Sequence, residues 1–190
     1  MTISVQMEAS SVIEALKKVT DNLPKQMSIV SMKAARTGKS AIAKIVSGKI
    51  MVTQATVKKK ITVKRVGPTG AQVTLDAAQR INLRHFGARQ TKKGVGYKID
   101  RGGKRKTVVG AFQGPRPGRM NIKWKGMPFI RDNLANNRST IRPLGWGPSP
   151  YGVLKKNDQV KVVEEIIRAE LRKQMAERLR YLTLKKSGTI

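Results

Sequence analysis

The residues of this chain best suited to chemistry are cationic side chains that occur in short runs. Two runs of three stand out, Lys58-Lys59-Lys60 and Lys104-Arg105-Lys106. Lysine and arginine bind phosphate groups through charge and hydrogen bonds, and no covalent bond changes. The runs therefore predict recognition of a polyanion. The positions that we expect to face it are Lys58, Lys59, Lys60, Lys64, Arg65, Arg101, Lys104, Arg105 and Lys106.

A nucleotide site is much less well supported. Gly38-Lys39-Ser40 is similar to the end of a phosphate-binding loop, but Lys33 stands where that motif needs its first glycine. The tripeptide also lies inside a helical pattern with no strand before it. Gly94-Val95-Gly96 lacks the third glycine of a dinucleotide motif, because Ile99 occupies its place. We expect both segments to be structural.

Catalytic and metal sites are not predicted. The chain has no cysteine, and His85 is its only histidine, so thiolate sites and two-histidine metal motifs are excluded. No serine or carboxylate lies near His85 in sequence, and we interpret it as a packed or surface side chain. The late glutamates alternate with arginine and lysine, which is typical of pairing on a helix surface. We predict no catalytic residue, no metal and no cofactor.

The charge balance supports the polyanion interpretation. The chain has 40 Lys and Arg residues against 11 Asp and Glu residues, a formal net charge of +29. No acidic residue occurs between Asp21 and Asp76. With 39% hydrophobic residues and clear periodicity the chain is not a disordered basic tail, so we expect a basic face on a folded surface. Nucleic acid is the commonest such polyanion, and aromatic residues are too few, at 4%, to favour base stacking.

The hydropathy patterns predict an α+β fold in a single domain, residues 1–190. Apolar residues at helical spacing predict a helical hairpin over 1–48, with one helix from Ser11 and a second from Pro24 to about Ser47. Residues 157–183 have a continuous apolar stripe and predict a long amphipathic helix, capped by Asn157 or Asp158. No apolar run is long enough to span a membrane and no signal peptide is evident, so we expect a soluble, intracellular product.

Between these helices the pattern changes to strands. An antiparallel β meander is predicted over 71–126, with strands near 71–77, 81–86, 94–99, 106–112 and 121–124 and a hairpin turn at 101–104. Residues 56–65 fit a short helix and a strand equally well. Residues 138–156 are rich in proline and glycine and predict a long loop pinned by Trp146 and Tyr151.

Several apolar positions are predicted to form contacts between protein molecules. The loop offers two aromatic side chains, and the last helix offers its apolar stripe. The residues expected at this interface are Trp146, Tyr151, Ile167, Leu171 and Met175.

Two segments of the chain resemble a known family. Residues 80–99 (RINLRHFGARQTKKGVGYKI), followed by GGKRK at 102–106 and VGAF at 109–112, are similar to the central segment of the prophage minor tail protein Z family. Residues 142–154 (RPLGWGPSPYGVL) resemble the segment that precedes the last helix of that family. The inserted Trp146 and the stretch RPGRMN at 116–121 depart from its pattern.

The resemblance implies a structural role in tail completion in a long-tailed phage, at the junction of head and tail. It implies a virion component, present in the host cytoplasm during assembly, with other tail or neck proteins as partners: tail terminator, tail tube and connector. A ring of copies, which we expect to be a hexamer, would surround the genomic DNA and contact it without sequence specificity. No membrane partner is expected.

Two other classes share the charge. A ribosomal or other RNA-binding protein would cosediment with ribosomes in uninfected cells. An endonuclease would nick plasmid DNA in magnesium or manganese, although the acidic cluster needed to hold two metals is not evident in the sequence.

Overall fold

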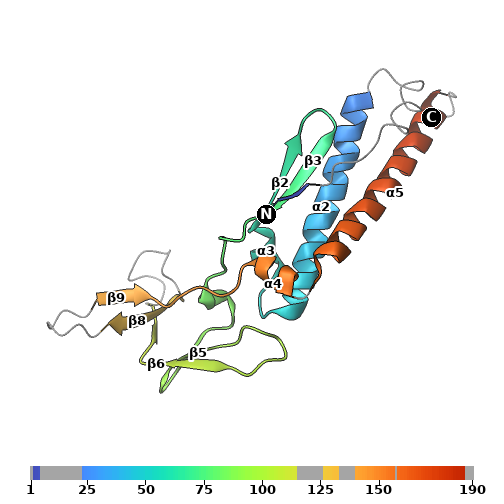
Figure 1. The fold of residues 1–190 in the computed structure, drawn as a ribbon. Helices are drawn as coiled ribbons and strands as arrows, with labels where there is room; N and C mark the ends of the chain where they lie inside the picture. The colour runs from blue at the N-terminus through green and yellow to red at the C-terminus, as the bar shows by residue number, and fades with distance from the viewer. Residues whose placement is uncertain (1, 5–22, 115–125, 133–139, 157, 187–190) are drawn as a thin grey trace.

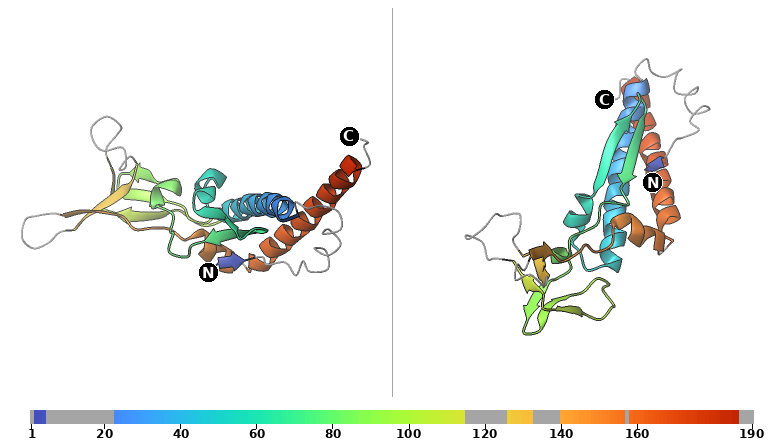
Figure 2. Two further views of the ribbon diagram at one scale, coloured as in Figure 1. Left: turned by 90° about the horizontal axis from the view of Figure 1, so that it is seen from above. Right: turned by 60° about the vertical axis from the view of Figure 1, so that its left-hand side comes forward.

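The computed structural model describes residues 2–4, 23–114, 126–132, 140–156 and 158–186. Two long helices lie side by side at one end of an elongated molecule, and small antiparallel sheets extend from the other end (Figure 1). The views in Figure 2 show that one pair of strands lies alongside the long helices, while the other strands lie beyond one end of them. The chain has the predicted α+β fold, with helices and antiparallel strands in separate blocks of sequence.

The two long helices are α2 (Leu23–Lys49) and α5 (Val160–Lys186), and they run antiparallel. Near one end of the pair, Met27, Val30 and Ala34 of α2 pack with Leu171 and Met175 of α5. Pro24 lies in the first turn of α2, as predicted, where its missing N–H costs no hydrogen bond. The apolar stripes that predicted these helices therefore face each other.

Gly38 lies where α2 and α5 approach most tightly among the described glycines of the helices. A Cβ atom added there would lie 2.5 Å from Cγ1 and 2.7 Å from Cδ1 of Ile167. The glycine of the supposed phosphate-binding tripeptide is therefore a helix-packing residue in the interior of α2. The structural interpretation of Gly38-Lys39-Ser40 is confirmed.

A three-stranded sheet lies along α2. Its order is β1 (Thr2–Ser4), β3 (Gly70–Leu75), β2 (Ile61–Val66), and all pairs are antiparallel. Alternation places Val73 and Leu75 of β3 in the main core. The ambiguous segment 56–65 contains both structures: α3 (Gln54–Lys58) begins at Thr53, whose side chain accepts a hydrogen bond from the Thr56 amide, and β2 follows it.

The second sheet has the order β4 (Arg89–Thr91), β5 (Gly94–Tyr97), β6 (Lys106–Val109). The predicted turn at 101–104 connects β5 and β6, and is confirmed. The predicted strand at 81–86 is wrong, because the segment forms the 3-10 helix η1 (Leu83–His85). Asn82 caps it, its side-chain oxygen accepting a hydrogen bond from the Arg84 amide at 3.0 Å.

The third sheet has the order β7 (Phe112–Gln113), β8 (Pro128–Asp132), β9 (Thr140–Pro143). The rings of Phe112 and Phe129 stack with centroids 6.0 Å apart. The segment predicted as one meander, 71–126, thus contributes strands to three small sheets, which also include strands before and after it. The predicted strand at 121–124 lies outside the described residues.

The predicted loop at 138–156 is only partly a loop, since it contains β9 and the helix α4 (Pro150–Lys156). Of the two aromatic side chains predicted to pin this segment, Tyr151 packs against the main core but Trp146 is exposed, and the residue next to Trp146, Gly147, makes the close contact. A Cβ atom at Gly147 would lie 2.4 Å from Cε2 of the buried Phe86, and the Gly147 amide donates to the Ile81 carbonyl at 2.8 Å. The ring of Phe86 therefore packs directly on the backbone of this segment.

The ends of the predicted helices also need correction. Helix α5 begins at Val160, and Asp158 belongs to the end of α4: its φ is +50°, its amide donates to Lys155, and the Gln159 amide donates to Leu154. This is the left-handed pattern that ends helices, so Asp158 is not the cap of α5, and the other predicted cap, Asn157, lies outside the described residues. Within 1–48, β1 was not predicted, and the first helix of the hairpin lies outside the described residues.

A substitution at Gly38 tests the α2–α5 packing. We expect Gly38→Ala to destabilise the protein by about 1 kcal/mol, because overpacking against Ile167 outweighs the better helix propensity of alanine. Gly48→Ala is the matched control in the same helix, since a Cβ atom there meets nothing within 4 Å. It should be neutral or slightly stabilising in urea unfolding. Equal effects of the two substitutions would contradict the tight contact.

Candidate nucleic-acid interface

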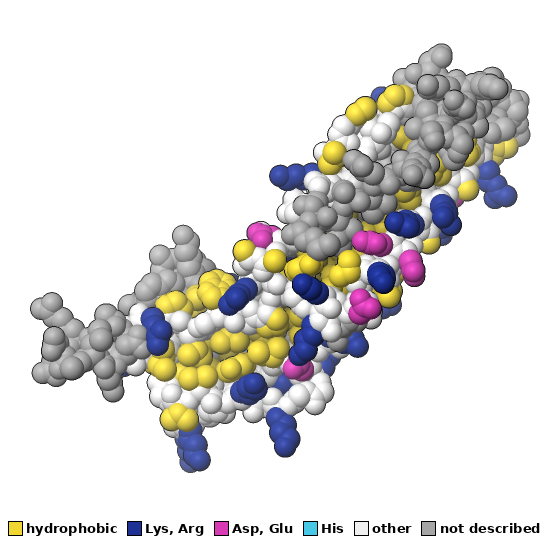
Figure 3. Space-filling model, in the orientation of Figure 1, with side chains coloured by type: hydrophobic (Ala, Val, Ile, Leu, Met, Phe, Trp, Pro, Cys, Tyr) yellow, Lys and Arg dark blue, Asp and Glu magenta, His cyan; other side chains and the backbone are white. Residues whose placement is uncertain are grey.

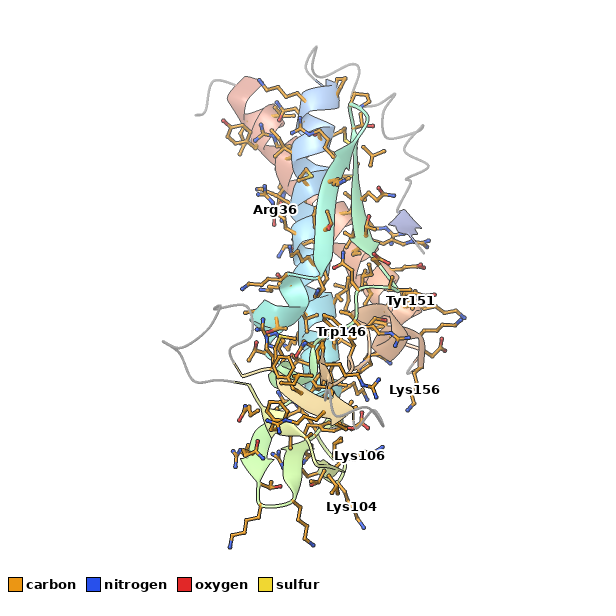
Figure 4. All side chains as sticks on the ribbon, turned by 90° about the vertical axis from the view of Figure 1, so that its left-hand side faces the viewer. Arg36, Lys104, Lys106, Trp146, Tyr151 and Lys156 are labelled. Carbon is orange, nitrogen blue, oxygen red and sulfur yellow. The ribbon has the colours of Figure 1, made fainter. Side chains whose placement is uncertain are left out.

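The predicted polyanion-facing residues lie on three separate elements. Lys58 is the last residue of α3, and Lys59 and Lys60 follow it. Lys64 and Arg65 lie on β2. Arg101, Lys104 and Arg105 lie between β5 and β6, and Lys106 is the first residue of β6. Figure 4 shows basic side chains at several levels of the molecule, from Arg36 on α2 to Lys104 and Lys106 at the far end of the second sheet. The structure therefore does not bring the predicted residues together into one patch.

Seven lysine and arginine side chains of this set are well placed to meet a polyanion. Lys59, Lys64, Arg65, Lys104 and Lys106 are exposed, and Lys58 and Lys60 are half-buried. Among the described residues, none of the five lysines Lys58, Lys59, Lys64, Lys104 and Lys106 forms a side-chain hydrogen bond or an ion pair. Their charges are available to phosphate groups.

Two arginines of the predicted set have structural bonds instead. The Arg101 guanidinium donates to the Ser47 carbonyl at 2.5 Å, and its amide donates to the Lys49 carbonyl, so Arg101 caps the end of α2. The Arg105 guanidinium donates to the carbonyls of Gly87 and Gly96, at 2.9 and 3.0 Å. We therefore correct the prediction for these two residues: their side chains first hold the second sheet to its neighbours.

Two further residues belong to the basic surface and were not predicted to face a polyanion. Arg84 and His85 form part of η1, and the charges of Arg84, Lys59 and Lys60 act on His85. The pKa of His85 is lowered, first because burial penalises the charged ring and then because these three cations repel a fourth. Half burial of His85 agrees with its interpretation as a packed or surface side chain. Only the fold shows that the charges of Lys59 and Lys60 act on it.

Acidic side chains are concentrated elsewhere. Glu164, Glu165, Glu170 and Glu177 are all on α5, and the acidic side chains on the face shown in Figure 3 lie mainly along the helical part. Lys and Arg side chains occur along the whole described length of that face. Within the described ranges, no group of three His, Cys, Asp or Glu residues could hold a metal ion.

The residues predicted to contact another protein molecule differ in their exposure. Trp146 is 56% exposed, and Tyr151 is half-buried against the main core; Figure 4 shows both at the junction of helices and sheets. Ile167, Leu171 and Met175 are buried against α2 of the same chain. The prediction that these three contact another molecule is therefore wrong, because the apolar stripe of α5 already has its partner.

Comparisons with known proteins returned no match to a family model, a curated protein or a solved structure. In the part of the chain that the structure describes, no helix combines the length and apolar character needed to cross a membrane.

Lys104 and Arg105 are adjacent in sequence, so a pair of substitutions can separate a structural cation from one whose charge is free to bind a polyanion. We expect Arg105→Ala to destabilise the protein by about 1 to 2 kcal/mol, because two carbonyl oxygens lose a charged donor. Lys104→Ala removes the same charge from an exposed side chain and should change stability by less than about 0.5 kcal/mol. Thermal unfolding of both variants measures this. Similar stability losses would show that Arg105 has no special structural role.

Proposed function

We propose that this chain is a structural protein of a tailed phage that acts in tail completion at the head–tail junction. In this proposal the protein is a virion component, made in the host cytoplasm, and it has no catalytic activity. Its partners are other tail or neck proteins, and several copies, most simply six, form a ring around the genomic DNA. The resemblance of residues 80–99 and 142–154 to the prophage minor tail protein Z family supports the role.

The observation that carries the proposal is the large surplus of cations on a folded surface. A net charge of +29 on 190 residues opposes the compact state through self-repulsion, so it is costly unless a polyanion is close. The exposed lysines Lys59, Lys64 and Lys106 have no ion-pair partner among the described residues. A protein that lies beside packaged DNA would use this charge directly.

The arrangement of the cations favours contact with the DNA backbone over base recognition. The basic positions are distributed along an elongated molecule, and no described element presents a row of cations and aromatics as single-strand binders do. Such a distribution suits a strand of phosphates that runs past the protein, where register on the sequence does not matter. We therefore infer non-specific binding to duplex DNA.

The proposed contacts between protein molecules centre on Trp146. Its ring is the largest exposed aromatic group of the described residues, and its backbone is fixed by the Asn82–Trp146 bridge and by the packing of Gly147 on Phe86. An exposed indole on a rigid support is the usual form of an energetic hot spot at an interface. This proposal replaces the buried stripe of α5 as the interface.

DNA binding gives a direct test of the charge argument. We expect a short duplex to bind with an affinity that falls steeply with salt and does not depend on base sequence. Lys104→Ala combined with Lys106→Ala should reduce the slope of log affinity against log salt by about 1 to 2, because each lost phosphate contact contributes about 0.9. A DNA affinity that does not change with salt concentration would contradict the proposal.

The cellular location separates the proposed role from the ribosomal or RNA-binding alternative. Quantitative mass spectrometry of purified phage particles should find this chain in copy numbers comparable to other neck proteins. If the chain instead cosediments with ribosomes and is missing from the particles, the RNA-binding alternative is correct and the virion role is wrong.

A substitution at Trp146 tests the proposed interface. We expect Trp146→Ala to leave the stability of the monomer nearly unchanged, because the indole is mostly exposed, but to weaken self-association at least tenfold. Tyr181→Ala is the matched control, since Tyr181 is 41% exposed and lies on α5. Sedimentation velocity measures both variants. An unchanged association constant for Trp146→Ala would remove Trp146 from the interface.

A further inference from the structure

Four residues from two distant segments form a basic cluster at the junction of helices and sheets. Lys59 and Lys60 lie in the turn between α3 and β2, and Arg84 and His85 lie in η1. The charges of Lys59, Lys60 and Arg84 all act on the His85 ring. We refer to these four residues as the His85 cluster.

The backbone that carries the His85 cluster is held by hydrogen bonds and by the core. The amides of Lys59 and Lys60 donate to Ala55 and Val57, at 3.2 and 2.9 Å, and the His85 amide donates to Asn82 at 3.1 Å. The neighbours Val57, Leu83 and Phe86 are buried in the same hydrophobic cluster. The cluster is therefore built on a rigid support, which reduces the entropy lost when a ligand binds.

Within the cluster, His85 is held as a neutral ring. The Arg84 side chain donates through Nε to Nε2 of His85 at 3.2 Å, so Nε2 uses its lone pair and carries no proton. Lys59 is exposed and Lys60 and His85 are half-buried, which leaves the cluster open to a ligand from solvent.

The groups around the ring are all cationic. The charges of Lys59 and Lys60 act on it from the α3–β2 turn, and that of Arg84 from its own helix. Just beyond it, the Lys98 amide donates to the Phe86 carbonyl and the Arg105 side chain donates to the Gly87 carbonyl. No carboxylate is among the charges that act on His85 in the described part of the chain. An anionic ligand would therefore be attracted to this cluster.

We propose that the His85 cluster is a phosphate-binding site for the DNA backbone, and that His85 takes up a proton from solvent when a phosphate binds. The proposal rests on the DNA contact of the proposed function and assigns it a particular site and a pH dependence. A bound phosphate offsets the repulsion from the three permanent cations. The protonated Nε2 then donates to the phosphate, and the Arg84 guanidinium, released from Nε2, can donate as well.

The direction of the pH effect follows from this proton uptake. In the free protein the pKa of His85 lies below its ordinary value of 6.5, because of burial and the three cations, so the ring is neutral at pH 7. A bound phosphate raises the pKa. A ligand that raises a pKa binds more tightly as the pH falls, so DNA affinity should increase as the pH is lowered from 8, and the gain approaches about tenfold for each pKa unit of the shift once the pH is below both pKa values.

His85 is the single histidine of the chain, so its NMR ring signals can be assigned without ambiguity. The ring proton signals of His85 are followed by NMR from pH 8 to pH 5, with and without a short duplex DNA at low salt. We expect the pKa of His85 to rise by about one unit or more in the complex. Lys59→Ala combined with Lys60→Ala should abolish most of the DNA-induced rise, while Lys92→Ala combined with Lys93→Ala, two exposed lysines of the β4–β5 turn, should leave it intact.

A second variant separates proton uptake by His85 from the fixed charges of the neighbouring lysines and arginine. His85→Gln keeps a hydrogen-bonding side chain but cannot titrate, so its DNA affinity should be nearly constant from pH 8 to pH 6, apart from the small effect of the terminal amine. If the protein binds DNA but the titration of His85 is the same with and without it, the site is wrong and the proposed function stands. If no DNA binds even at low salt, both proposals are overturned.

Discussion

Burial of Phe86 against the backbone of Gly147 is the contact on which the arrangement of the surface depends. The ring is fully buried, and a Cβ atom at position 147 would overlap its edge, 2.4 Å from Cε2 and 2.6 Å from Cζ. This contact fixes η1 on one side and the segment that carries Trp146 on the other. It therefore determines where Arg84 and His85 lie relative to Lys59 and Lys60, and how the indole is presented. A larger residue at position 147 would disturb the basic cluster and the proposed interface together.

The high net charge imposes a second constraint on the molecule. Folding brings 40 cations close together, and this repulsion must be balanced by a core that continues from the helix pair through β2 and β3 to Phe86. Salt and polyanions act differently on this balance. Salt screens the repulsion and should help folding, but it weakens DNA binding. DNA neutralises the same charges at particular positions, so binding and stability are coupled.

The sequence predicted those parts of the fold in which local pattern and tertiary packing agree. Helices α2 and α5 have long apolar stripes, and β3 alternates with period two, so each could be recognised from periodicity alone. The segment 81–86 has a similar alternation, but Asn82 caps a 3-10 turn there, and a local hydrogen bond overrides the pattern. Helix α4 was missed because a segment rich in proline and glycine predicts a loop, although proline suits a helix start.

The candidate site was predictable in composition but not in geometry. Runs of lysine identify cations, but they do not show that Arg101 and Arg105 are bound to carbonyls or that the charges of Lys59 and Lys60 act on His85, because these interactions join distant residues. Asn82, two residues before Arg84, was a local sign that η1 is a capped turn. The apolar stripe of α5 was similarly ambiguous, since a stripe predicts burial without identifying the partner that buries it.

The most direct test of the central claim is cryo-electron microscopy of the neck of the phage particle that contains this chain. The account predicts density for several copies in a ring at the head-proximal end of the tail, with the lysines of α3, β2 and β6 toward the DNA and Trp146 at a contact between proteins. A neck whose density is fully accounted for by other proteins, with this chain absent, would contradict it.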